Sequence, residues 1–193
     1  MKLLSRVVWS EGMYLAPHHF QTQSRYFEDS IASIAQSLWR EPWGLLQLEL
    51  DEQAITNGRA AVLHAAGIFP HGLPFDMPDS DVVPEGRDLS KLFSATATEL
   101  QLFLGFAPGS PRYQNRSHIF RDETNGVDEQ EVELAQKNIV ILAGGEITPG
   151  MLTIPLARVV RDSRGQMVYD HEFVPACLRI SACLLYTSDA ADE

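Results

Sequence analysis

Two adjacent histidines, His18 and His19, are the residues of this sequence best suited to bind a metal ion or act as a catalytic base. A neutral imidazole binds metal ions and can act as a general base near neutral pH. Neighbouring residues on a helix, however, point about 100° apart, so this pair cannot easily converge on one ion. Glu11 could supply a third ligand or a base, but no partner lies at metal-site spacing. We therefore expect the histidines to bond to the backbone or pack at an interface, and Glu11 to be a solvated or capping carboxylate.

Other candidate reactive groups also lack the patterns that their chemistry requires. There is no Gly-x-Ser-x-Gly elbow, and Cys177 has no nucleophile signature around it, which favours a buried structural thiol. The glycine-rich stretch at residues 142–150 lacks the Gly-x-x-x-x-Gly-Lys pattern of a phosphate loop and is expected to be a turn that ends a strand. One acidic cluster could hold calcium but lacks regular loop spacing, so we expect a solvated hairpin. Its members are Asp122, Glu123, Asp128, Glu129, Glu131 and Glu133.

Composition narrows the class of protein further. The last eleven residues, "CLLYTSDAADE" at 183–193, look like a translated sequencing adapter, so we exclude them from fold reasoning and expect the native protein to continue beyond Ala182. The remainder has 23 acidic against 15 basic residues, which argues against nucleic acid as a ligand. A single remaining cysteine, Cys177, excludes an internal disulfide framework and suits a reducing cytoplasm. No apolar window is long enough to span a membrane.

Periodicity predicts one long helix near the N-terminus, after a short strand at Arg6–Trp9. Pro17 suits a first helical turn, and Pro42 disfavours helix just before it, which predicts a helix over about residues 18–40. Large apolar residues then recur at spacings of seven, four, three and four, so we expect this face to be buried in the core. They are Phe20, Phe27, Ile31, Ile34 and Leu38.

Strand signals dominate the rest of the chain. Apolar alternation predicts strands around residues 45–50 and 99–106, and an apolar run predicts another at residues 137–144. Asn57-Gly58 predicts a type I′ hairpin. Further turns are predicted at Asn125-Gly126 and at residues 162–165, and an irregular surface loop at residues 69–86. Short strands joined by tight turns, with one long amphipathic helix, predict a mainly β protein built as an antiparallel β-sandwich in one large domain.

The N-terminal stretch "VVWSEGMYLAPHHFQTQSRYFE" resembles the opening of the TssK family of type VI secretion baseplate proteins, also called ImpJ or VasE. Later segments follow in the family's order, namely "WGLLQLELDE", "AAGIFPHGLPFDMP", "DEQEVELAQKNIVIL", "LARVVRD" and "HEFVPACLRISA". The resemblance covers residues 2 to 182, and His71 and Ala176 depart from the usual pattern. It identifies an interface or structural motif made of Trp9, Glu11, Gly12, Met13, Leu15, Pro17, His19, Phe20 and Gln21.

The resemblance implies a non-enzymatic cytoplasmic adaptor without cofactors or metals. TssK-like proteins are trimers when full length, with an N-terminal β-sandwich called the shoulder, which is related to that of phage receptor-binding proteins. The shoulder docks on the TssF and TssG wedge proteins, and a C-terminal domain reaches the TssJ-TssL-TssM membrane complex at the inner membrane. Residues 1–182 are therefore expected to be the shoulder alone, without the helical neck and C-terminal domain, and to be mostly monomeric.

Two other functions remain open on the residues alone. A carbohydrate-acting enzyme on a β-sandwich would need His19, Glu11 or Asp76 to converge in one pocket. A phage-type receptor-binding protein would instead recognise cell-surface sugar with a similar sandwich. Aromatic residues such as Trp9, Tyr14, Phe20 and Trp39 could anchor an interface or pack in the core.

Overall fold

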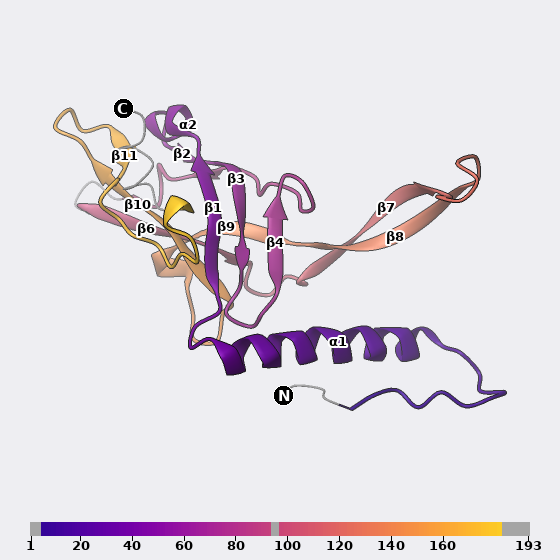
Figure 1. Ribbon diagram of the computed structural model, residues 1–193. Helices are drawn as coiled ribbons and strands as arrows, with labels where there is room; N and C mark the ends of the chain where they lie inside the picture. The colour runs from indigo at the N-terminus through magenta and orange to yellow at the C-terminus, as the bar shows by residue number, and fades with distance from the viewer. Residues whose placement is uncertain (1–4, 94–96, 183–193) are drawn as a thin grey trace.

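The computed structural model describes residues 5–93 and 97–182. It contains two main antiparallel sheets, two smaller two-stranded sheets, and one long helix, α1, along one side (Figure 1). This arrangement confirms the predicted class, mainly β with a long N-terminal helix. The segment at 183–193 lies outside the described residues. The helices are α1 (Pro17–Leu38) and α2 (Glu52–Thr56), with single 3-10 turns η1 (Gly144–Glu146) and η2 (Ile180–Ala182).

The two main sheets pack face to face and share one core. One sheet has the order β1-β3-β4 and the other the order β11-β10-β6-β9, with antiparallel pairs throughout. Figure 1 shows their strands crossing at a steep angle. The strands are β1 (Gly44–Leu50), β3 (Val62–Ile68), β4 (Pro74–Met77), β6 (Glu99–Phe106), β9 (Ile139–Ala143), β10 (Thr153–Arg161) and β11 (Met167–Tyr169).

Alternating apolar residues fill the space between the sheets. In β6, Leu102 and Leu104 are fully buried, as the predicted strand face requires. Phe69 joins the layers because its ring packs 4.9 Å from that of Phe75 in β4 and 5.2 Å from that of Phe106 in β6. Burying each large apolar side chain contributes about 1.5–3 kcal/mol, so this shared core stabilises the domain.

A two-stranded arm projects from the sandwich. It is made of β7 (Tyr113–Arg121) and β8 (Glu129–Lys137), joined through the predicted Asn125-Gly126 turn, where Gly126 has φ +68°. Every residue of β7 is exposed, so the arm has little core of its own. At its base, Lys137 Nζ donates to both oxygens of the buried Asp81 at 2.9 and 2.8 Å, which ties the arm to the loop after β4.

Three sequence-based expectations about local structure were wrong. Residues 52–56 form α2 instead of a hairpin arm, because Asp51 Oδ1 accepts from the N–H groups of Gln53 and Ala54 and caps a helix. Arg6–Trp9 is not a strand. The expected irregular loop at residues 69–86 contains β4, which pairs with β3, and β5 (Arg87–Asp88) follows and pairs with β2 (Arg59–Ala60).

Candidate interaction surface

The N-terminal segment folds back along the first turns of α1 (Figure 1). The indole of Trp9 lies 6.3 Å from the ring of His19 and 6.1 Å from that of Phe20, measured between ring centroids. Earlier in the chain, Arg6 Nε donates to the hydroxyl of Tyr26 at 3.1 Å, and the Arg6 guanidinium lies over the Tyr26 ring. These contacts hold residues 6–9 beside the helix. Among the described residues, the segment does not pair with a strand.

His19 is a helix-capping residue. Its Nδ1 accepts from the N–H of Ala16 at 3.1 Å, while the N–H of His19 donates to the carbonyl of Ala16 at 3.0 Å. Pro17 occupies the first turn, where no intrahelical donor is lost. His18 is exposed, and no group of three potential metal ligands occurs in the described part of the chain. His19 therefore bonds to the backbone as expected, whereas His18 is exposed.

The remaining motif residues shape the approach to α1. Glu11 and Gly12 form a turn in which Gly12 has φ +77°, a conformation that favours glycine. Met13 closes it, because its N–H donates to the carbonyl of Ser10 at 3.3 Å and its sulfur accepts from the N–H of Ser10 at 3.4 Å. Leu15 and Gln21 are exposed. The structure therefore joins Trp9, Met13 and His19 to the approach and start of α1 by specific contacts, while Leu15 and Gln21 face solvent.

The apolar face of α1 is exposed, contrary to the expectation that it is buried. We call it the α1 stripe. Its members are Phe20 (55% exposed), Phe27 (55%), Ile31 (68%), Ile34 (61%) and Leu38 (68%). The helix contacts the body through its small-residue side instead, where the buried Ala32 meets Gly72: a Cβ on Gly72 would lie 2.7 Å from Ala32 Cβ. The aromatic side chains expected to pack in the core, Trp9, Tyr14 and Trp39, are also at least half exposed.

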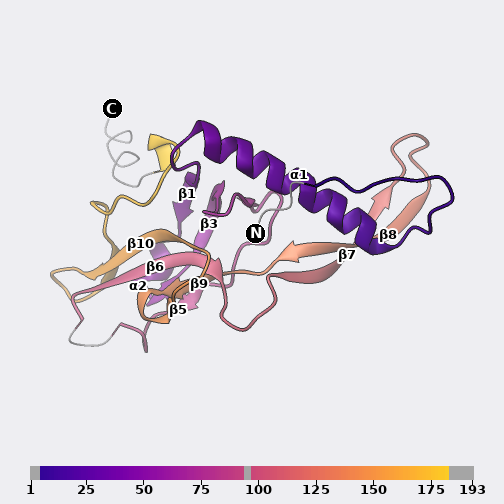
Figure 2. The same cartoon turned by 90° about the horizontal axis from the view of Figure 1, so that it is seen from below.

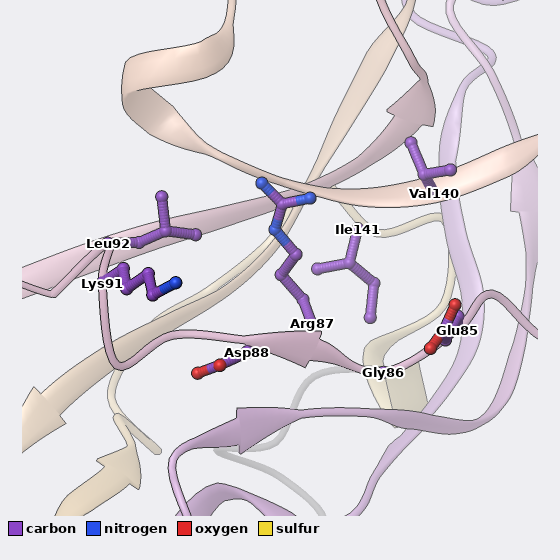
Figure 3. A pocket seen from close by; sticks show the side chains of 8 residues that line it. All are labelled: Glu85, Gly86, Arg87, Asp88, Lys91, Leu92, Val140 and Ile141. Carbon is purple, nitrogen blue, oxygen red and sulfur yellow. The ribbon is translucent and has the colours of Figure 1, made fainter.

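The three residues of the enzymatic alternative are not brought together. Glu11 lies in the N-terminal turn, His19 at the start of α1, and Asp76 on the exposed side of β4. A hollow of about 460 Å³ lies elsewhere, beside β5 and β9 (Figure 3). There Arg87 is paired with Glu146 of η1, so its charge is already neutralised. The residues that line this hollow are Glu85, Gly86, Arg87, Asp88, Lys91, Leu92, Val140 and Ile141.

The acidic cluster lies on the projecting arm. Glu129 is paired with Arg121 at 2.8 Å, Glu131 accepts from the Ser117 hydroxyl, and Glu133 accepts from Asn115 at 3.3 Å. At the tip, Asp122 accepts from the N–H groups of Thr124 and Asn125, which lowers its pKa. These carboxylates are engaged in a solvated hairpin, as the sequence predicts.

One polar group near the α1 contact lacks a partner. The Nδ1 atom of His71 is buried and has no hydrogen-bond partner among the described residues. Burial, with a smaller contribution from the positive charge of Arg112, lowers the pKa of this imidazole. His71 follows Phe69, whose ring it contacts, and precedes Gly72, which packs on α1. Burial therefore favours the neutral form of this imidazole.

Comparison with known proteins decides the family. The profile of bacterial type VI secretion proteins described as VasE, ImpJ and EvfL matches residues 19–189. The chain belongs to this family. A VasE-family relative from Pseudomonas aeruginosa, the type VI secretion system baseplate component TssK1, is 30% identical over 192 residues. That alignment covers 92% of this chain and 43% of the relative, so the chain spans less than half the relative's length.

Solved structures share the VasE-family fold. The TssK-TssF-TssG baseplate subcomplex contains a chain that matches with a TM-score of 0.84 at 23% identity, covering 98% of this chain and 68% of that one. A crystal structure of TssK matches with a TM-score of 0.83 at 22% identity, covering 97% of this chain and 47% of that one. The described helices include none long and apolar enough to cross a membrane.

Sequence reasoning predicted the helix α1 but missed which way it faces. Periodicity identified the five apolar positions of the α1 stripe, and such a stripe normally faces a core. The actual contact joins the small residues Ala32 and Gly72. The sequence alone does not show that these two residues meet, since the contact depends on a close approach that only the fold creates.

Proposed function

We propose that this chain is the wedge-docking shoulder of a type VI secretion baseplate adaptor. The observation that carries the proposal is its 30% identity to a protein described as a baseplate component, along 92% of this chain. Support also comes from the fold, since a similar chain occurs in a TssK-TssF-TssG baseplate subcomplex. On this proposal the partners are TssF and TssG.

The adaptor role requires a binding surface and no catalysis. The described residues offer exposed aromatic side chains, Trp9, Tyr14 and Phe20, on a backbone held by hydrogen bonds and ring contacts. Such residues often supply most of the binding energy of an interface. The proposed interface motif is therefore the segment from Trp9 to Gln21, and the proposed role is non-enzymatic, without a cofactor or metal.

The rest of the adaptor would lie beyond this chain. We propose that residues 1–182 form the shoulder domain and that residues 183–193 are not native. A helical neck and a C-terminal domain would follow in the native protein. The full-length protein would form a homotrimer, and its C-terminal domain would contact the TssJ-TssL-TssM membrane complex. The protein would then work in the cytoplasm, docked at the inner membrane through the assembled secretion complex. A relative more than twice as long as the matched region supports a longer native protein.

Co-purification tests the proposal. The longer native protein should retain TssF and TssG, and a form that lacks residues 1–182 should lose both. Within the shoulder, Phe20→Ala with Trp9→Ala should weaken retention, because each side chain is at least half exposed in the free domain. The matched control is Val132→Ala on the arm, which also removes an exposed apolar side chain. Retention of both partners without residues 1–182 would refute the proposal.

A further inference from the structure

The docked side of α1 lies on the turn between β3 and β4. Two backbone hydrogen bonds close this turn: the N–H of Gly72 donates to the carbonyl of Phe69 at 2.8 Å, and the N–H of Phe69 donates to the carbonyl of Leu73 at 2.9 Å. Gly72 meets Ala32, the buried residue of α1. In the view from below, α1 extends from beside β1 towards the arm (Figure 2). The turn is therefore a place where the position of α1 is fixed.

His71 lies within this turn and is the titratable residue closest to the contact in sequence. Its ring centroid lies 6.0 Å from that of the fully buried Phe69, and its buried Nδ1 has no hydrogen-bond partner among the described residues. A charged imidazole carries a hydrogen on both ring nitrogens. Protonation of His71 would therefore place an N–H donor and positive charge where no described acceptor meets them, which costs free energy.

The charges around the turn do not offset an added proton. Burial and the positive charge of Arg112 both lower the pKa of His71, and no described carboxylate raises it. Asp29 lies on the docked side of α1, one turn before Ala32. The charged groups that act on Tyr113, at the base of the arm, are Glu28 and Arg25 of α1, Arg112 and Asp81.

The body holds α1 through little apolar area. The docked side of the helix carries the small or polar residues Gln23, Ser30, Ala32 and Ser33, which are half-buried or buried, while the α1 stripe faces solvent. Such a contact gains little from apolar burial, and an element held in this way opens at a lower cost than global unfolding. A modest penalty at His71 is therefore enough to change how often α1 is docked.

We propose that protonation of His71 releases α1 from the turn between β3 and β4, so that α1 is docked at neutral pH and detaches in mild acid. An imidazole in the open turn takes up a proton near its ordinary pKa of about 6.5, whereas the docked turn resists the proton. Docking therefore weakens as the pH falls below that value. The N-terminal segment would move with the helix, because Arg6 and Trp9 contact residues of α1. The proposal does not rest on the baseplate role.

Hydrogen exchange of the 193-residue chain at about pH 7.5 and about pH 5.5 tests this release, with exposure times matched to the intrinsic exchange rate at each pH. Backbone amides around Ala32 should lose protection by about threefold or more at the lower pH, because an undocked helix of this length is only marginally stable in water. Amides of Leu102 and Leu104, in the core strand β6, should keep their protection. This difference distinguishes release of α1 from acid unfolding of the whole domain.

Variants at His71 assign the effect to its imidazole. His71→Gln and His71→Phe do not titrate in this range, so the protection of α1 should become independent of pH in both. Using two variants keeps the test valid if one of them disturbs the turn. His64→Gln, at an exposed histidine of β3, is the matched control and should respond to pH like the wild type. A wild-type α1 whose protection does not fall relative to β6, or a pH response that persists in the His71 variants, would overturn the proposal.

Discussion

At the scale of single residues, His19 has a structural role at the start of α1. Its Nδ1 satisfies the N–H of Ala16, a donor that precedes the first helical turn and has no intrahelical acceptor. Its ring also contacts Trp9, so one side chain fixes both the start of α1 and the returning N-terminal segment. His18, one position away, is exposed and points elsewhere. The two histidines therefore have different roles despite being neighbours.

This difference predicts unequal costs for the two alanine substitutions. His19→Ala should lower the free energy of unfolding by about 0.5–2 kcal/mol, the range measured for lost helix caps. His18→Ala should change it by less than about 0.5 kcal/mol, as expected for an exposed residue. Chemical denaturation of both variants gives the comparison. Equal effects would mean that the contact with Ala16 contributes nothing to stability.

At the scale of elements, α1 shows the limit of periodicity as a guide. The spacing of its apolar residues predicted a helix at the right place, Pro17–Leu38, because the pattern follows from helical geometry alone. The side that docks depends on the shape of the body, where Gly72 leaves room for Ala32. The expectation that the apolar face of α1 is buried is thus wrong for this chain, so Ile31→Asp would not place a charge in the core. With Ile31 68% exposed, the cost should be below about 0.5 kcal/mol.

Local helix capping explains another difference between the sequence-based prediction and the structure. Asn57-Gly58 is typical of a hairpin, but Asp51 caps the preceding residues and makes them helical. Gly58, at φ +76°, then ends the short helix instead of turning two strands. The same glycine conformation serves both turns, so the dipeptide alone cannot distinguish them. By contrast, β6 was predictable from its alternating apolar residues, and β9 from a short apolar run that contains β-branched residues.

The docking of α1 should be sensitive to a single methyl group. Gly72→Ala would place a Cβ 2.7 Å from that of Ala32 and would require an alanine at φ +93°. We expect a loss of unfolding free energy of about 1–3 kcal/mol from strain and displaced packing. Gly165→Ala is the control, because Gly165 has φ +78° but no atom within 4 Å of the added Cβ. If chemical denaturation gives both variants the same loss of unfolding free energy, the contact between Gly72 and α1 contributes nothing to stability.

At the scale of the whole molecule, a compact sandwich carries two outlying elements. The shared core of the two main sheets supplies the rigid body, and α1 and the β7–β8 arm extend beyond it (Figure 1). Both carry large apolar residues in solvent, including Ile119 and Phe120 on the arm. A domain of this kind is suited to binding other proteins. Its core is already formed, while the exposed apolar side chains of α1 and the arm can still be buried against a partner.

Direct binding to the wedge proteins tests the proposed adaptor role most simply. The purified 193-residue chain should be mixed with a TssF–TssG complex from the same bacterium and separated by size-exclusion chromatography. We predict one peak that contains all three proteins, because the proposed docking surface lies within the described sandwich and its N-terminal segment. Separate elution, under conditions in which the longer native protein binds the same complex, would place the docking surface outside this chain and contradict the account.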